Sequence, residues 1–210
     1  SERLRKVINK GISEEDLLIA TRNAFKLGWR LVKLYFMLGL PTETDADLAA
    51  IIALSERAKK TGKGTQGGAN INVAVSTFVP KAHTPFQWEE QLSLKETERR
   101  QELLKQNLKW NSLRCKWHDA QLSMLEGVFA RGDRRLAAVL EKAVDLGCRF
   151  DGWRDHFRFD LWQQAFTASK IEPDWYLRKR ESDEILPWDH IDCGIPKQFL
   201  LREREKAVAG

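Results

Sequence analysis

The sequence predicts an α/β fold with a parallel sheet, followed by a mainly α-helical second part. Between residues 14 and 78, two segments with helical spacing of apolar residues alternate with two short apolar segments typical of buried strands. Helices and strands that alternate at such short intervals are typical of parallel strands joined by crossovers. After about residue 93 almost every predicted element is a helix, and most of the eight tryptophans lie there.

The first helix is predicted from about residue 14 to residue 27. Ser13 is a typical N-cap, three acidic residues follow it, and Gly28 comes directly after the last apolar position. Residues 31–38 then form a short run of large apolar side chains bounded by glycines. This run predicts a buried strand.

A second helix and a second strand follow at similar spacing. Thr44 can cap the helix together with Asp47, and its apolar stripe continues to a glycine-rich loop over residues 61–68. Residues 69–78 alternate polar and apolar side chains and end before Pro80, as a strand would. The two helix–strand pairs therefore predict two parallel strands.

The second part of the chain is predicted to be helical, with one short strand at residues 113–118. Capping residues and glycines delimit the helices; Asp133, for example, is the expected N-cap of one of them. The first predicted helix is capped by Ser93 and runs from about residue 94 to residue 111. The others span residues 120–131, 134–146, 161–168 and 197–207, while residues 174–179 fit more than one structure.

Composition restricts the class of protein. No run of eighteen apolar residues exists, and the first residues lack the apolar core of an export signal, so neither a membrane protein nor a secreted one is expected. The net charge of +5 is a weak indication of an anionic partner. Three cysteines without a CxxC pair argue against a disulfide framework and favour a reducing, cytoplasmic location.

Two loops at the carboxyl ends of the predicted strands are candidate binding segments. In parallel sheets ligands bind at this edge, which points to residues 37–44 and 78–86. Gly39 allows a ligand to approach the backbone, and the helix capped by Thr44 presents its positive N-terminus to an anionic or nucleotide-like ligand. The alternative is that this segment is only a tight connection between strand and helix. The pattern alone leaves both interpretations open.

Three stretches resemble segments of radical S-adenosylmethionine (radical SAM) enzymes. Lys33–Leu48 resembles the fifth barrel strand and its turn, where Gly-x-Pro-x-Glu-Thr leads into an acidic helix start. Ser1–Gly11 resembles the turn and helix after the fourth strand, and Val75–Phe86 resembles the end of the sixth. The residues from Leu122 onward resemble the tail of a subfamily whose members also carry an N-terminal cobalamin-binding-type domain.

The resemblance implies a partial, half-length TIM-like radical SAM barrel over residues 1–112 and a helical, tryptophan-rich extension over residues 113–210. The cofactors implied are S-adenosylmethionine, a [4Fe-4S] cluster and, in this subfamily, cobalamin; the partners implied are the remainder of the barrel and the cobalamin-binding-type domain. By resemblance, the cofactor-binding residues are Met37, Leu38, Gly39, Leu40, Phe78, Val79 and Pro80, with Ser1 and Lys10 near the methionyl or ribose part.

The CxxxCxxC motif that holds the cluster in this family is absent from this chain. Cys115, Cys148 and Cys193 lie too far apart in the sequence to replace it, because the family needs three thiolates on one short loop. The chain is therefore expected to be a fragment of an enzyme that has no radical chemistry by itself. The alternative is a noncatalytic module that binds RNA or serves as a scaffold.

The RNA alternative rests on aromatic and cationic residues that alternate in the second part of the chain, as in binders of single-stranded RNA. The set comprises Trp153, Arg154, Phe157, Arg158, Trp162, Trp175, Arg178, Lys179 and Arg180. The competing interpretation is that Phe159, Trp162 and Phe166 form the buried face of a helix. No DNA-binding or membrane role is expected.

Weaker candidates remain. A metal could be bound near Cys115, His118 and Asp119, or near His190 and Cys193, but neither group has the paired spacing of a zinc site. His83 could transfer protons, although a lone loop histidine is more often solvated. Substrate-pocket residues could come from Glu126, Arg131, Asp133 and Arg134, for which salt bridges and helix capping are equally good explanations.

Overall fold

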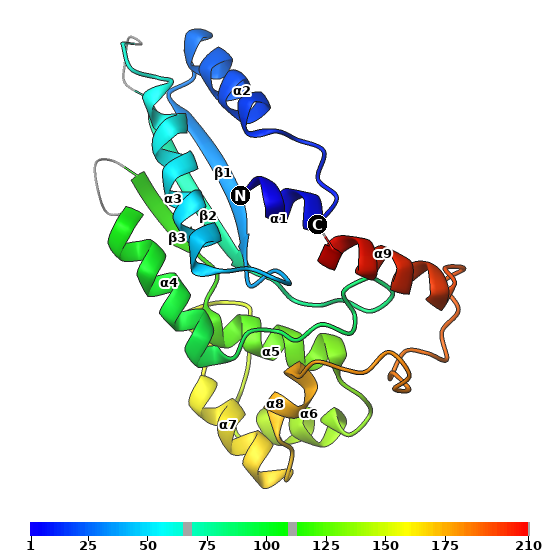
Figure 1. The fold of residues 1–210 in the computed structure, drawn as a ribbon. Helices are drawn as coiled ribbons and strands as arrows, with labels where there is room; N and C mark the ends of the chain where they lie inside the picture. Colours follow the sequence, from blue (N-terminus) through cyan, green and yellow to red (C-terminus); the bar gives the residue numbers. More distant parts are fainter. Residues whose placement is uncertain (65–68, 109–112, 210) are drawn as a thin grey trace. The chain divides into compact units, whose positions relative to one another are not determined.

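A computed structural model of the protein describes residues 1–64, 69–108 and 113–209. Its contacts divide the chain into two compact units: Ser1–Phe78, Leu94–Ala120 and Pro196–Gly210 form the first, and Val79–Ser93 and Gln121–Ile195 form the second. The elements in chain order are α1 (Glu2–Val7), α2 (Glu14–Lys26), β1 (Leu31–Leu38), α3 (Asp45–Lys60), β2 (Asn70–Thr77), α4 (Leu94–Leu108), β3 (Leu113–Trp117), α5 (Ala120–Arg131), α6 (Leu136–Asp145), α7 (Phe159–Ala168), α8 (Pro173–Leu177) and α9 (Lys197–Ala209) (Figure 1).

The first unit contains a parallel three-stranded sheet with the strand order β1-β2-β3. Both pairs of neighbouring strands are parallel, so that Leu34 in β1 lies beside Val73 in β2, which in turn lies beside Cys115 in β3. The expected α/β class with parallel strands is therefore confirmed. The finer expectation, a half-length TIM-like barrel, stays a prediction, because the described residues form one sheet of three strands.

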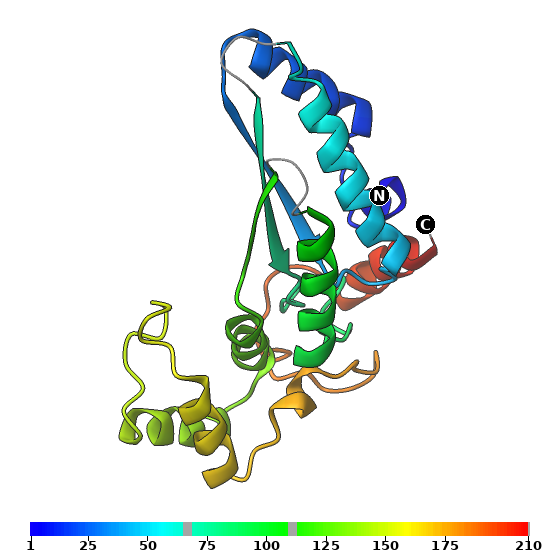
Figure 2. The same ribbon diagram turned by 90° about the vertical axis from the view of Figure 1, so that its left-hand side faces the viewer.

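The core of the first unit lies between one face of the sheet and its helices. Figure 2 shows α3 (cyan) and α4 (green) along the same side of the sheet. The side chains on that face are almost inaccessible, and Leu38, Ile71 and Val73 are 0% exposed. From α3, Leu48 and Ala58 are likewise 0% exposed, which is the expected result for the apolar stripe of an amphipathic helix.

Local sequence signals fixed most element ends. Ser13 and Asp16 form the capping box of α2 through reciprocal bonds, and Thr44 is the N-cap of α3, as expected. Two expectations extend beyond the described residues: the loop at 61–68 includes residues 65–68, and the helix predicted to 111 ends, as far as the structure describes it, at Leu108.

The predicted start of α6 was wrong. The regular helix begins at Leu136 and its N-cap is Arg135, not Asp133. The Asp133 carboxylate instead accepts a 2.9 Å bond from the backbone N of Arg135, two residues on, and holds the Arg135 guanidinium at 2.7 Å. An aspartate that bonds the backbone two residues ahead forms a turn before the helix, which a capping pattern alone does not distinguish from an N-cap.

The second unit buries polar as well as apolar side chains. The guanidinium of Arg131 is 0% exposed and donates bonds of 2.7 Å to the backbone carbonyls of Tyr176, Glu89 and Arg178. Burial lowers its pKa to about 10. Arg180, 2% exposed, donates to the carbonyl of Arg131. Through these bonds the two arginines connect segments of the second unit that no sheet pairing joins.

In the described part of the chain, no helix combines the length and the apolar character that crossing a membrane requires.

Candidate functional site

The turn after β1 is held in a specific conformation by its backbone. Gly39 has a φ of +87°, which glycine adopts at no steric cost. The backbone N of Glu43 donates to the carbonyl of Leu40 at 3.0 Å, so Leu40–Glu43 form a β-turn with Pro41 in second place. Thr42, in third place, has a φ of +67°, an unfavourable value for a β-branched residue. The turn is therefore tight and locally strained.

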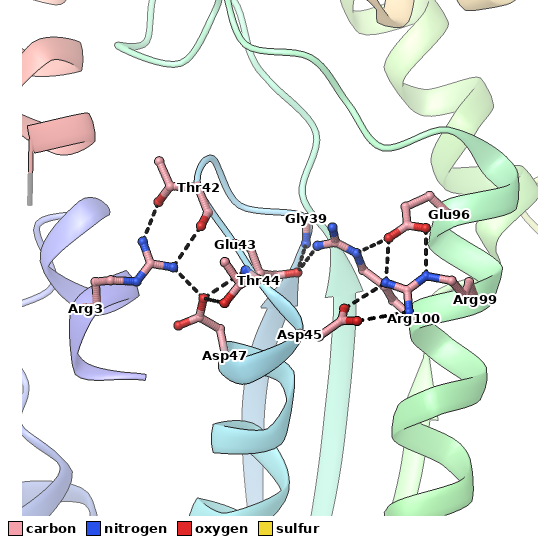
Figure 3. Close-up of polar contacts among 10 residues, drawn as sticks. All are labelled: Arg3, Gly39, Thr42, Glu43, Thr44, Asp45, Asp47, Glu96, Arg99 and Arg100. Atoms are coloured by element: carbon pink, nitrogen blue, oxygen red, sulfur yellow. Dashed lines mark hydrogen bonds and ion pairs between the residues drawn. The ribbon is translucent and has the colours of Figure 1, made fainter.

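A buried carboxylate, Glu43, keeps the turn closed (Figure 3). Its side chain is 1% exposed, and its Oε1 accepts bonds from the backbone N of Gly39 at 2.8 Å and from Arg100 at 2.7 Å. Its second oxygen has no partner among the described residues. Burial raises the pKa of Glu43, although the bonds from Gly39 and Arg100 oppose this shift.

Arg100 connects this turn to α4. Its guanidinium also binds Glu96 at 2.7 Å, and the neighbouring Arg99 binds Glu96 at 2.8 Å and Asp45 at 2.7 Å (Figure 3). Bonds from Arg99 and Arg100 lower the pKa of Glu96 to about 2. The first turn of α3 is thus connected to α4 by a chain of charged groups.

A second carboxylate, Asp47, connects α3 to α1. It accepts bonds of 2.9 Å from the backbone N and the hydroxyl of Thr44, and it also binds Ser1 and Arg3. Its pKa lies well below the ordinary value, because these bonds outweigh the effect of burial. Arg3 also donates to the side chain and the carbonyl of Thr42, at 2.7 and 2.8 Å. Arg3 therefore holds the strained residue of the turn.

A cavity of about 400 Å³ adjoins these contacts within the first unit. Residues of α1, α2, β1, α3 and β2 line it, as do Ser1 and residues of the segments that follow α1 and β1. Most of its surface is apolar, from Leu4, Ile8, Ile12, Leu17, Ile51 and Leu54. The polar lining includes Arg5, whose Nε is buried without a hydrogen-bond partner in the described residues. Its volume and composition are those of a small-molecule pocket.

Four of the nine predicted cofactor-binding residues line this one cavity: Ser1, Lys10, Met37 and Leu40. The other five lie elsewhere. Leu38 is buried on the covered face of the sheet, Gly39 gives its backbone N to Glu43, and Phe78 donates its backbone N to the carbonyl of Leu38 at 2.7 Å. Val79 and Pro80 are buried at the start of the second unit. Their binding role stays a prediction.

The weaker candidates have structural partners. Glu126 pairs with Lys81 at 2.5 Å, and the backbone N of His83 donates to Gln87. Cys115 is half-buried on β3, Cys148 is buried and Cys193 is exposed. Over residues 1–64, 69–108 and 113–209, no three His, Cys, Asp or Glu side chains lie together as metal ligands would.

Several side chains of the aromatic and cationic set in the second unit are buried. Trp162 and Phe166 are buried on one face of α7, as the competing interpretation expected, whereas its third residue, Phe159, is half-buried. Arg180 is 2% exposed. Arg178 lies 3.6 Å from the ring centre of Trp175 and binds Glu184 at 2.6 Å. RNA contact through this set stays a prediction, and its exposed members include Trp153, Arg154 and Lys179.

Sequence reasoning missed the residues that hold the turn. Glu43 belonged to the Gly-x-Pro-x-Glu-Thr pattern and was the one available signal, since a carboxylate four residues after a glycine can bond back to its N–H. No local sequence pattern indicates the roles of Arg100 and Arg3, because they lie 57 and 39 positions from their partners in the turn.

No protein-family model matches the chain, and no solved structure does. An uncharacterized protein of Methanocaldococcus jannaschii is 36% identical over 142 residues, which cover 67% of this chain. The chain spans 30% of the length of that relative.

Proposed function

We propose that this chain is part of a radical SAM enzyme and supplies part of the surface that binds S-adenosylmethionine, within a parallel barrel that other segments complete. The observation that carries the proposal is the clustering of Ser1, Lys10, Met37 and Leu40 around one cavity. The resemblance assigned these four residues to the cofactor from two separate stretches of sequence, Ser1–Gly11 and Lys33–Leu48. They meet beside a turn whose shape is fixed by Gly39 and Glu43.

The cavity suits the cofactor in size and chemistry. Ligand pockets commonly measure about 300–1,000 Å³ and combine apolar walls with a few polar groups. Met37 and Leu40 offer apolar surface to a purine ring, and Lys10 offers a cation to the polar end. The Ser1 hydroxyl already donates to Asp47, so it can only accept a bond from the ligand. Bound to a four-iron cluster, the cofactor supplies radical chemistry to enzymes of this class. The residues of this chain would bind and orient it.

The described residues do not fit the cluster itself. Cys115 belongs to the first unit, whereas Cys148 and Cys193 belong to the second, and no group of metal-ligand side chains is found among the described residues. No catalytic step is therefore assigned to this chain alone. Under the proposal, the cluster motif, the remaining strands and the cobalamin-binding-type domain lie elsewhere in a cytoplasmic protein. The greater length of the Methanocaldococcus jannaschii relative is consistent with such a protein.

Binding of labelled S-adenosylmethionine to the protein encoded by the whole reading frame, purified without oxygen and loaded with iron and sulfide, tests the proposal. Equilibrium dialysis gives the dissociation constant. Leu40→Arg and Met37→Glu should each weaken binding about tenfold or more, because both place a charge in the apolar wall. The matched control is Arg22→Gln, an exposed position on α2 outside the cavity. Equal affinities for all four proteins would refute the proposed site.

A further inference from the structure

The face of the sheet opposite α3 and α4 is open to solvent. Side chains alternate along a strand, and the register of the three strands places a defined set on this face. We call it the open face; it comprises Leu31, Lys33, Tyr35 and Met37 of β1, Asn70, Asn72, Ala74 and Ser76 of β2, and Arg114 and Lys116 of β3. Parallel sheets are normally covered on both faces. This face instead exposes cations together with apolar side chains such as Leu31 and Tyr35, which makes it a candidate binding surface.

The charge of the open face has one sign. Lys33, Arg114 and Lys116 are all exposed, and the ten side chains that define the face include no aspartate or glutamate. Among the described residues, none of these three cations forms an ion pair. Arg99 on α4 is by contrast paired with Asp45 and Glu96. The open face therefore attracts anions.

The spacing of the cations suits a chain of anions more than a single one. Lys33 and Arg114 share a row across the sheet, on either side of Asn72. Strands lie about 4.8 Å apart, so the Cα atoms of these two cations are about 10 Å apart, and Lys116 lies two residues, about 7 Å, further along β3. A ligand that reaches all three has several negative groups at such intervals.

An exposed aromatic ring lies among these cations. Tyr35 is 73% exposed, its ring centre is 5.4 Å from Nζ of Lys33, and its row across the sheet ends at Lys116. A flat ring beside cations on an open sheet is how many proteins stack a base of single-stranded nucleic acid while they neutralise its phosphates. The neutral amide of Asn72 lies where it can bond a base edge or a ribose 2′-hydroxyl.

We propose that the open face binds single-stranded RNA, with phosphates at Lys33, Arg114 and Lys116 and a base stacked on Tyr35. Its residues belong to the first unit, whereas the aromatic set belongs to the second. Tyr35, Met37 and Ser76 of the open face also line the cavity proposed for the cofactor. Under the proposed function, the same face lines the interior of a barrel and the bound nucleotides are the substrate. RNA binding is measured without S-adenosylmethionine, so the failure of one proposal leaves the other standing.

Fluorescence anisotropy with a labelled ten-nucleotide oligouridine and the 210-residue chain tests the inference. For single strands, the slope of log K against log salt changes by about 0.7 for each phosphate that the protein neutralises. The variant Lys33→Gln/Arg114→Gln/Lys116→Gln should therefore bind at least tenfold more weakly at low salt and show a slope smaller by about 2. Tyr35→Ala should cost about tenfold, whereas Tyr35→Phe should bind like the wild-type protein because it keeps the ring.

The matched control removes three exposed cations from helices, as Arg22→Gln/Lys26→Gln/Lys60→Gln, and circular dichroism verifies that all variants fold. The inference is overturned if this control loses as much affinity as the open-face variant, or if Tyr35→Ala binds normally. It is also overturned if Arg154→Gln/Lys179→Gln alone abolishes binding, since the second unit would then hold the RNA. Equal binding of oligothymidine or duplex RNA would contradict single-stranded RNA as the ligand, as would the absence of binding.

Discussion

Replacing Arg100 with methionine should destabilise the first unit far more than the same change at the neighbouring Arg99. The two arginines lie side by side on α4 and both bind Glu96. They differ in their second partner: Arg100 reaches the buried Glu43, whereas Arg99 reaches the exposed Asp45. The pair is therefore a matched test of whether the Glu43 contact holds the turn.

The magnitude follows from burial. The side chains of Glu43 and Arg100 are 1% and 13% exposed. Removal of one partner from a buried ion pair costs about 3–5 kcal/mol, because the other charge stays buried without compensation. Arg100 keeps some contact with water, so we expect about 3 kcal/mol for Arg100→Met. For Arg99→Met, whose ion pairs are exposed, we expect no measurable change.

Urea denaturation followed by circular dichroism at pH 7.5 and at pH 5 measures both the cost and its cause. Burial raises the pKa of Glu43, so the folded protein takes up a proton there more readily than the unfolded chain. The neutral carboxyl needs no cation, and the cost of Arg100→Met should therefore shrink as the pH falls towards the ordinary pKa of glutamate. The double variant Glu43→Gln/Arg100→Met should be more stable than Arg100→Met at pH 7.5. Equal stabilities of the Arg99 and Arg100 variants, or a cost independent of pH, would refute this reasoning.

Three further outcomes are expected from unfolding experiments. Gly39→Ala should cost about 1–2 kcal/mol, because its φ of +87° is unfavourable for alanine, whereas Gly11→Ala, at a position with open space around the added Cβ, should be neutral. Arg131→Met should lower the free energy of unfolding by about 3 kcal/mol or more, because three buried carbonyls lose their hydrogen-bond donor. A loss below about 1 kcal/mol would mean that water molecules take the place of the guanidinium. The lowered pKa of Asp47 means that its contribution to stability is complete above the ordinary pKa of aspartate and shrinks as the pH falls below it, so Asp47→Asn should destabilise at pH 7 and cost clearly less at pH 2.5.

Local patterns were sufficient to predict most elements of the fold. The run at 31–38 became β1 with the predicted bounds, because a short apolar segment between glycines has few other folded conformations. The N-caps of α2 and α3 were also predicted correctly, since capping depends on residues three positions apart. The start of α6 was predicted wrongly because the bonds of Asp133 are set by Arg135 rather than by a helix N-terminus.

The candidate site depends on contacts that no local pattern contains. Gly39 could be singled out because glycine lets a ligand approach the backbone, whereas Leu40 was assigned only through the resemblance to radical SAM enzymes. The roles of Arg3 and Arg100 depend instead on how α1 and α4 pack against the turn. A charged residue on an amphipathic helix is normally solvated, so the sequence gives no reason to assign these two arginines to a buried carboxylate or a strained turn.

The central claim is most directly tested by the formation of 5′-deoxyadenosine from S-adenosylmethionine. The protein encoded by the whole reading frame would be purified without oxygen, loaded with iron and sulfide, and reduced with dithionite, and the product would be quantified by chromatography. The proposed function predicts 5′-deoxyadenosine with the wild-type protein and markedly less with Leu40→Arg. No 5′-deoxyadenosine from a protein with an intact four-iron cluster, or a reading frame without a CxxxCxxC motif, would contradict it.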